Sequence, residues 1–366
     1  MLPGLDVTDG VWPVQMKMVS KIAGLCLLTS VLANAPLLVA ASPKVMTSYD
    51  DGARLYRDSL SADANCRYAA RLSNTYWKTG RSFSARIVHD GSGIRSIEYL
   101  APQAFRGRWI FETGANEWLI DTKRHIIERR PVSQPNPHQL VIVPPLLKKN
   151  YVITVDKRPT EAAERPAVLL VIRRREDGKI VRRLWVDKCT DIVLKKEIYG
   201  DRGSLLISSA ISDVSFHPEF VNKVVLNLFL NNRKFQHTIQ RDTKQKAVHV
   251  LDLREALGGN ADSPKVIQSF RLTGANMIGI GAQGVLHLRY TDGLNVISVF
   301  EKRKYSISEP TRVPESMRPI KVANIDAHII RKASLITLNW DVRLLNITVI
   351  GEVPFSSLKR FVSAMH

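Results

Sequence analysis

Apolar and polar side chains alternate with a period of two residues along most of this chain, and this pattern constrains the fold more than any other feature. In the stretch KIVRRLWVDK, Ile180, Leu184 and Val186 fall on one face. Arg183 and Trp185 fall on the other face. Such alternation is typical of β-strands with one buried face. Because parallel strands need crossover connections of about a dozen residues, and the connections here are short turns such as REDG and GDRG, the sequence predicts an antiparallel meander.

Alternating runs fill the first half of the chain and are separated by turns rich in Gly, Asp and Asn. They cover 83–89, 94–101 and 105–113, continue on both sides of the turn DTKR, and resume from 151 to 216. A sheet with this many strands tends to curl on itself. We therefore expect an α+β protein whose first part is a half-open antiparallel β-barrel. A helix at 50–62 and short helical turns at 137–150 would cover one face.

The alternation ends at His217-Pro218, where a helical pattern replaces it. Residues 219–230 place apolar side chains three and four apart, as on the buried stripe of a helix. A Lys-rich stretch and a second short helix at 252–259 follow before strands return, and a last helix is predicted at the C-terminal end. The predicted domains are 1–41, a leader and signal peptide; 42–217, the barrel; 218–262, a helical and basic connector; and 263–366, a small α+β domain.

The N-terminal region has the pattern of a secretory signal peptide. Two lysines precede the apolar stretch 22–41, and small residues at its end indicate cleavage near Ala41. Translation would then start at Met16 or Met18. The alternative is an uncleaved anchor, since about 20 apolar residues can span a bilayer. Cleavage near Ala41 predicts a periplasmic or otherwise extracytoplasmic protein.

The chain is strongly basic, with 53 Lys and Arg against 34 Asp and Glu and a formal net charge of +19. Such a charge attracts nucleic acid, acidic lipid headgroups or anionic wall polymers. Export makes nucleic acid an unsuitable partner, which leaves an anionic membrane surface or the wall. Alternatively, the charge serves only to keep an exported protein soluble.

The sequence contains no pattern that supports catalysis, a cofactor or a metal. The segment GIGAQG (279–284) has the spacing of a dinucleotide-binding loop, which needs a helix directly after it. Here VLHLRY follows and alternates like a strand, so we interpret the segment as a glycine-rich hairpin. The nine histidines show no paired spacing that would predict a zinc site. We therefore predict a protein that is not an enzyme.

Five large apolar side chains on the predicted strands are candidate ligand contacts. They are Trp109, Phe111, Trp118, Leu119 and Trp185. Packing in the core is the ordinary role of such residues, but on a curled sheet they could equally line an apolar groove.

Two cysteines remain once the signal peptide is removed. Cys66 begins the first strand region and Cys189 lies in the turn DKCTD, at the corner of a sheet. In an exported protein two cysteines suggest a disulfide, and we predict that these two lie close enough to form one.

Three segments carry a resemblance to known families. The run RRLWVDKCTDIVLKKEIYGDRGSL resembles hairpins of the LolA-like superfamily, whose half-open barrels carry lipid-modified or amphiphilic ligands. LRYTDGLNVISVFEKR (288–303) and ITVIGEVPFSSLKRFV (347–362) resemble signatures of the sigma-E regulatory family RseB/MucB. The layout, a large LolA-like domain followed by a small α+β domain, is also similar. In place of the usual Thr-Gly turn, this chain has Thr190-Asp191.

The resemblance implies a periplasmic negative regulator of an envelope-stress sigma factor. It would bind an anti-sigma factor and release it on meeting lipid or lipoprotein acyl chains held in the barrel. The small domain, through Tyr290, Asp292, Leu294 and Phe300, would contact the anti-sigma factor. These four residues could instead serve only the hairpin, since Asp-Gly is a good turn. The alternatives to a regulator are a LolA-like lipid or lipoprotein carrier and a scaffold on anionic wall polymers.

Overall fold

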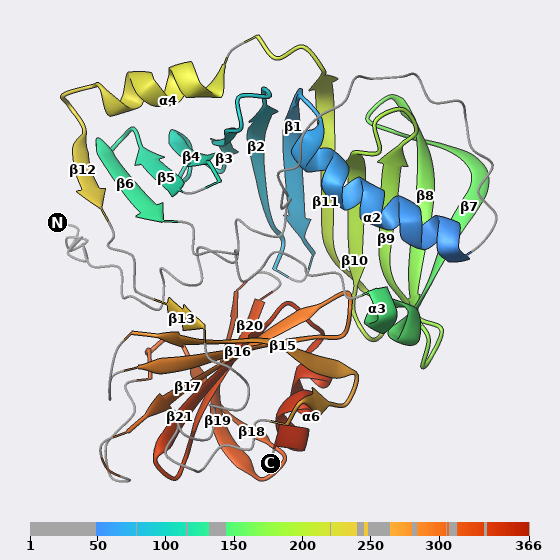
Figure 1. The fold of residues 1–366 in the computed structure, drawn as a ribbon, viewed down its shortest axis with the longest axis vertical. Coiled ribbons are helices and arrows are strands. Elements are labelled where there is room, and N and C mark those ends of the chain that lie inside the picture. Colours follow the sequence, from blue (N-terminus) through green and yellow to red (C-terminus); the bar gives the residue numbers. More distant parts are fainter. Residues whose placement is uncertain are drawn as a thin grey trace, which may run out of the picture.

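Two large β-sheets make up most of the protein, one above the other in Figure 1. The structure is a computed structural model. It describes residues 49–77, 79–114, 116–131, 144–219, 221–239, 245–247, 264–279, 284–304, 306, 313–332 and 335–365. The predicted signal peptide, its cleavage near Ala41 and the predicted helix at 252–259 lie outside the described residues.

The first sheet has 12 strands and contains the predicted meander. Its strands, in their order across the sheet, are β12 (Gln236–Ile239), β6 (Ile126–Pro131), β5 (Asn116–Asp121), β4 (Arg108–Glu112), β3 (Arg95–Ala101), β2 (Arg81–His89), β1 (Tyr68–Tyr76), β11 (Leu205–Ser215), β10 (Val193–Tyr199), β9 (Ile180–Asp187), β8 (Arg165–Arg174) and β7 (Tyr151–Ala162). Two meanders, β1–β6 and β7–β11, thus join where β1 pairs with β11.

One pairing differs from the expected antiparallel barrel. Strand β12 runs parallel to β6, with Gln236 opposite Ile126. The segment between β11 and β12 contains a helix and leads from the middle of the sheet to the edge formed by β6. Strand β12 is added at that edge in the same direction as β6. The two outer strands of the sheet, β12 and β7, do not pair with each other in the described part of the chain, and the sheet is therefore open rather than closed into a barrel.

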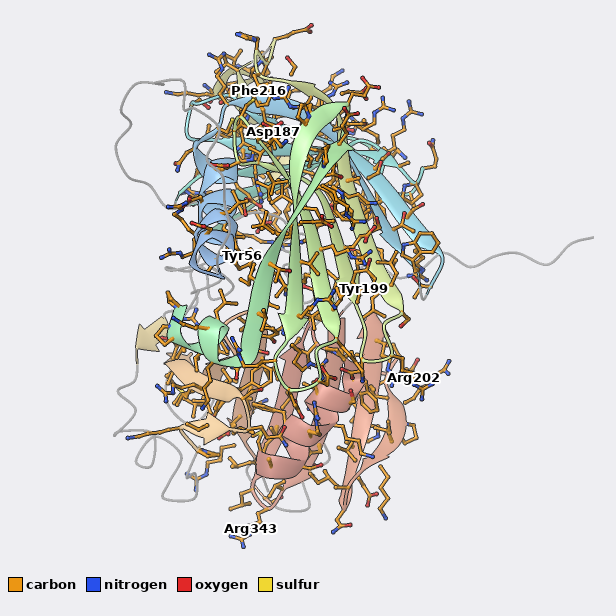
Figure 2. All side chains as sticks on the ribbon, turned by 90° about the vertical axis from the view of Figure 1, so that its right-hand side faces the viewer. Tyr56, Asp187, Tyr199, Arg202, Phe216 and Arg343 are labelled. Atoms are coloured by element: carbon orange, nitrogen blue, oxygen red, sulfur yellow. The ribbon has the colours of Figure 1, made fainter. Side chains whose placement is uncertain are left out.

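Two helices cover opposite faces of this open sheet. Helix α2 (Tyr49–Asn65) lies across β7–β11, and its Leu55 and Tyr56 pack against Leu170 and Leu184 (Figure 1). Tyr56 projects from α2 toward these strands (Figure 2). The predicted helix at 50–62 lies within α2. Because successive strand residues point to opposite faces, the other face of β4–β6 needs its own cover.

Helix α4 (Asn222–Leu230) provides that cover. The helix lies over the ends of β4–β6 (Figure 1), and its Leu226 is buried against Phe111, Ile120 and Ile127. Helix α4 and strand β12 fall within the predicted connector 218–262, but α4 packs on the first sheet and β12 pairs with it. The domain boundaries themselves stay predictions.

The second sheet has nine strands and lies below the first in Figure 1. Its strands, in order, are β13 (Gln245–Ala247), β15 (Phe270–Ile278), β16 (Val285–Thr291), β17 (Val296–Arg303), β21 (Leu345–Gly351), β20 (Leu335–Val342), β19 (Ile325–Lys332) and β18 (Arg318–Val322), and β14 (Val266–Ile267) pairs with β15. Strand β16 follows the glycine-rich segment directly, as the hairpin interpretation requires.

Helix α6 (Phe355–Met365) closes one side of the second sheet. Its Leu358, Phe361 and Val362 are fully buried in the core of that sheet. A shorter helix, α3 (Pro144–Asn150), lies between the two sheets, directly before β7 (Figure 1). It occupies the C-terminal part of the segment where the paired prolines predict short helical turns.

Candidate functional site

The turn between β16 and β17 joins the two sheets. The Asp292 Oδ1 atom accepts hydrogen bonds from the backbone N–H groups of Leu294, at 2.9 Å, and Asn295, at 2.7 Å. The Thr291 hydroxyl accepts a third from the N–H of Gly293, at 3.0 Å. The sequence DGLN therefore closes a tight turn by its own side chains, which presents the tip of the turn as a rigid unit.

Gly293 is required at the tip for two reasons. Its φ of 97° lies in the region that favours glycine. A Cβ atom at this position would also lie 2.3 Å from the backbone nitrogen of Leu147 in α3. The turn of the second sheet thus touches the backbone of the first part of the chain.

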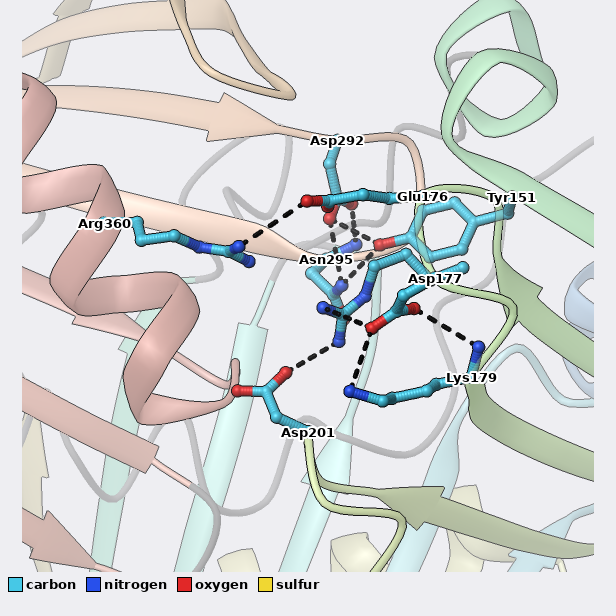
Figure 3. A network of polar contacts seen from close by, with 9 residues as sticks. Tyr151, Glu176, Asp177, Lys179, Asp201, Asp292, Asn295 and Arg360 are labelled. Carbon is cyan, nitrogen blue, oxygen red and sulfur yellow. Dashed lines mark hydrogen bonds and ion pairs between the residues drawn. The ribbon is translucent and has the colours of Figure 1, made fainter.

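A polar network fixes this contact (Figure 3). The Tyr151 hydroxyl donates to Asp292 Oδ2 at 2.6 Å, and Asn295 Nδ2 donates to the Tyr151 hydroxyl at 3.0 Å. From β9, the Arg182 guanidinium donates to the carbonyl oxygen of Leu294 at 3.2 Å and to Asn295 Oδ1 at 2.9 Å. Burial, reinforced by the Asp292 carboxylate, raises the pKa of Tyr151 well above its usual value. Tyr151 therefore remains a neutral donor to Asp292.

Leu294 is the apolar centre of the junction. Its side chain is fully buried, and it packs with Leu55, Tyr56 and Leu147, which belong to the first part of the chain. A residue of the small second sheet thus completes the core beneath α2. Burial of a leucine side chain contributes about 1.5–3 kcal/mol of stabilisation.

A cleft of about 310 Å³ opens beside this network. Residues from both sheets line it, with apolar side chains such as Val181, Ile198 and Phe270 among charged ones. Its basic residues are Lys149, Arg174, Arg175, Arg182 and Arg360, and its acidic residues are Glu176, Asp292 and Glu352. Among the lining residues five basic side chains thus stand against three acidic ones, and Asp292 is engaged by Tyr151.

Ion pairs line the rim of the cleft (Figure 3). Arg360 of α6 lies 3.7 Å from Glu176 in the β8–β9 turn, so this pair crosses between the sheets. Arg174 pairs with Asp201 at 2.7 Å and with Asp177 at 3.6 Å, which ties two turns of the first sheet together. The Arg360–Glu176 side chains are 46% and 68% exposed, and an exposed pair of this kind contributes at most about 1 kcal/mol.

The structure separates the five predicted groove residues. Trp109, Phe111 and Trp118 cluster under α4, where the ring of Phe229 lies 5.7 Å from Trp109 and 6.1 Å from Phe111. Leu119 is paired with Ile110, and these two point to the opposite face, because adjacent strand residues alternate.

Trp185 lies apart from the other four, on β9. The ammonium group of Lys195 sits 4.4 Å from the centre of its ring. The five residues therefore do not line one groove, and their role as ligand contacts stays a prediction.

The four predicted partner contacts are also separated. Asp292 and Leu294 belong to the junction. Tyr290 is fully buried in the second sheet, with its ring 5.2 Å from Phe361. Phe300 is half-buried and stacks on His287 at 4.4 Å. Two of the four thus connect the sheets and two pack within the second sheet, and a contact with a partner stays a prediction for all of them.

Asp187 and Phe216 lie at the end of the first sheet away from the second sheet (Figure 2). The N–H of Cys189 donates to Asp187 Oδ1 at 2.9 Å, and Cys66 packs against the same apolar cluster as Phe216. Both cysteines are thiols in the structure. Arg165 lies near both: its pKa is raised chiefly by its hydrogen bond to Asp187, and the two sulfurs also contribute. A disulfide between the cysteines stays a prediction.

Tyr151, Arg182 and Asn295 are the junction residues that sequence reasoning missed. A signal existed for Arg182, because it lies on the same strand face as Leu184 and Val186, which are both buried. A basic residue on an apolar face usually has a specific partner. Asn295 directly follows the DGL motif, whereas nothing in the sequence marks Tyr151.

Within the described ranges, no group of three or more His, Cys, Asp or Glu side chains is placed to hold a metal ion. Of the helices in the described part of the chain, none is long and apolar enough to cross a membrane.

Comparison with known proteins identifies similar molecules. The model of the MucB/RseB N-terminal domain family matches residues 62–237. The complex of Pseudomonas aeruginosa MucA and MucB resembles this chain with a TM-score of 0.54 and 15% identity, over 85% of this chain and 96% of the other. The structure of MucB in complex with MucA(peri) resembles it with a TM-score of 0.52 and 15% identity, over 85% of this chain and 96% of the other. At this identity the likeness establishes the fold. No curated protein matches the sequence.

Proposed function

Because residues 62–237 belong to the MucB/RseB N-terminal domain family, we propose that this protein is a non-catalytic regulator that binds the extracytoplasmic segment of a membrane-spanning anti-sigma factor. The family match carries the proposal. The fold supports it, since this chain resembles the structure of MucB in complex with MucA(peri) over 96% of that chain. The family membership that the sequence motifs indicate is confirmed by the match.

The junction cleft is the proposed binding site for the partner's segment. Two observations support this location: both sheets line the cleft, and its basic side chains outnumber its acidic ones. An extended segment with carboxylate side chains would be attracted by Lys149 and Arg360, whose cations lie at the rim. In this arrangement Asp292 shapes the wall of the cleft, and Leu294 holds the two sheets at the required spacing.

Lipid or lipoprotein acyl chains are the proposed signal for release, as the family resemblance implies. Three of the predicted groove residues, the aromatic side chains under α4, share one apolar cluster, whereas Trp185 packs against another. Such a chain would therefore enter beside Trp109 and Trp118, which are half-buried.

Binding of an anti-sigma factor is tested directly. The exported protein, recovered from cells, is titrated by calorimetry with the purified extracytoplasmic segment of a single-span anti-sigma factor from the same organism. The wild-type protein is expected to bind. The double variant K149E/R360E reverses two exposed cations of the cleft and is expected to bind roughly tenfold more weakly. The control variant R318E/K321E changes the total charge by the same amount, but on β18. Its affinity for the segment should match that of the wild type.

Two results would contradict the proposal in different ways. If no anti-sigma factor segment binds while native mass spectrometry of the exported protein shows bound lipid, the protein is a carrier of the LolA-like type. If the segment binds and both double variants weaken it equally, the regulator stands but the cleft is the wrong site. Salt-sensitive binding to purified wall polymer, with neither a segment nor lipid bound, would instead favour a scaffold.

A further inference from the structure

Helix α4 has a second apolar stripe that the first sheet leaves uncovered. Val221, Val224 and Leu228 are 42%, 56% and 69% exposed. Val224 and Leu228 are four residues apart and therefore lie on one side of the helix, and Val221 directly precedes the helix as its N-cap residue. Leu226, in contrast, is buried against the sheet. The helix is therefore apolar on two sides, and packing in this chain explains only one of them.

Basic side chains surround this stripe. Lys223 lies on the helix itself, and Arg233 and Lys234 follow its C-terminal end. All three are exposed, as are Lys123 and Arg124 in the β5–β6 turn. An exposed acid, Glu219, precedes the helix.

The β5–β6 turn is held close to the end of α4. The N–H of Gln236 donates to the carbonyl oxygen of His125 at 2.8 Å, and the rings of His125 and Phe235 lie 5.5 Å apart. The basic residues of the turn and those after the helix therefore form one group. This α4 surface comprises the three apolar residues and the five basic residues named above.

The shape and size of the α4 surface favour a lipid bilayer over a protein partner. It is the outward side of a helix at the end of the molecule away from the second sheet, so a plane can approach it (Figure 1). Three exposed apolar side chains are few for a stable protein interface, which buries about 20–30 residues on each side. They are enough for reversible insertion at a membrane interface when basic residues add attraction to anionic lipids.

We propose that the α4 surface docks the protein onto an anionic phospholipid bilayer. Leu228 and Val224 enter the boundary between headgroups and acyl chains, and the basic residues contact lipid phosphates. The docking is peripheral and reversible. It uses a face distant from the junction cleft and does not depend on binding of an anti-sigma factor.

The test measures binding of the exported protein, recovered from cells, to vesicles by co-sedimentation. Vesicles of phosphatidylglycerol and phosphatidylcholine are compared with vesicles of phosphatidylcholine alone. The wild type is expected to bind the anionic vesicles, and added salt should weaken this binding. L228S is expected to weaken it roughly tenfold, and R233Q/K234Q roughly 25-fold, at about fivefold for each basic residue.

Matched variants on the second sheet serve as controls. V266S removes an apolar side chain that is 51% exposed, and R318Q/K321Q removes two exposed basic residues. Both should bind as the wild type does. Equal weakening by the two double variants would overturn the proposal, because binding would then follow total charge. So would unchanged binding by L228S. Light scattering that shows a dimer lost in L228S would assign the surface to a second copy of the chain.

Discussion

Glu301 places a carboxyl group in the apolar core of the second sheet. The residue lies on β17, opposite Leu286 on β16 and Ile347 on β21, and only 4% of its surface is exposed. Among the described residues, its Oε2 atom has no hydrogen-bond partner. Burial alone raises its pKa from 4.5 to about 7. The carboxyl is therefore neutral in the folded protein at pH values where it would be ionised in the unfolded chain.

The sign and size of the effect on stability follow from this shift. Below pH 4.5 the carboxyl is protonated in both the folded and the unfolded state, so its ionisation does not change the free energy of unfolding. As the pH rises from 4.5 to about 7, the unfolded chain ionises while the folded protein does not, and the free energy of unfolding falls. A shift from 4.5 to about 7, at 1.36 kcal/mol per pH unit, gives a total loss of about 3 kcal/mol.

Glu301→Gln removes this cost because the amide cannot ionise and has nearly the same shape. Urea denaturation followed by circular dichroism, at several pH values between 4 and 8.5, measures the free energy of unfolding. The variant and the wild type are expected to be equally stable near pH 4. At pH 8 the variant should be more stable by about 3 kcal/mol.

Glu315→Gln is the control, because Glu315 is exposed. It should follow the wild type at every pH. If the stabilities of Glu301→Gln and the wild type differ by the same amount at pH 4 and pH 8, the Glu301 carboxyl is not held neutral in the folded protein, and the reasoning from burial is refuted.

Two further variants test the junction and the first sheet. Leu294→Ala empties the apolar centre of the junction and should lower the free energy of unfolding by about 2–5 kcal/mol in urea denaturation; a loss below 1 kcal/mol would show that Leu294 is not packed there. Burial, with the positive charge of Arg95, lowers the pKa of His89 from 6.5 to about 3. Stability should therefore fall as the pH drops below 6.5. His89→Phe should reduce the loss between pH 7 and pH 4 by about 3 kcal/mol, and an unchanged loss would contradict this.

The strands could be predicted because their signal is local. Alternation within each run identifies a strand and its buried face, and short turns identify antiparallel neighbours. The parallel pairing of β12 with β6 could not be predicted, since Gln236 and Ile126 are far apart in the chain. It depends on where α4 packs, and α4 shows only its own apolar stripe. The loss of strand alternation after His217 is the reason that the sequence predicts a connector over 218–262.

In the candidate site, too, the local turn could be predicted from the sequence, whereas its contacts with other strands could not. The DGLN turn is visible in the sequence, because Asp292 and Gly293 satisfy its geometry by themselves. What the turn contacts is decided by Tyr151 and Arg182, which come from other strands. Trp118 and Leu119 show the opposite case, since adjacent strand residues cannot share a face. Alternation alone could have separated those two residues.

The junction combines two kinds of interaction with different consequences. The buried side chain of Leu294 stabilises the contact between the two sheets, but apolar burial does not select one relative orientation of the sheets. The hydrogen bonds of Tyr151 and Arg182 to the turn are directional, and each would be left unsatisfied in a buried place if the sheets rotated. The exposed Arg360–Glu176 pair adds little to this. The spacing across the cleft is therefore set by the buried network. A partner bound in the cleft as proposed would meet a preformed distance between the sheets, and its release would not require the rim ion pair to break.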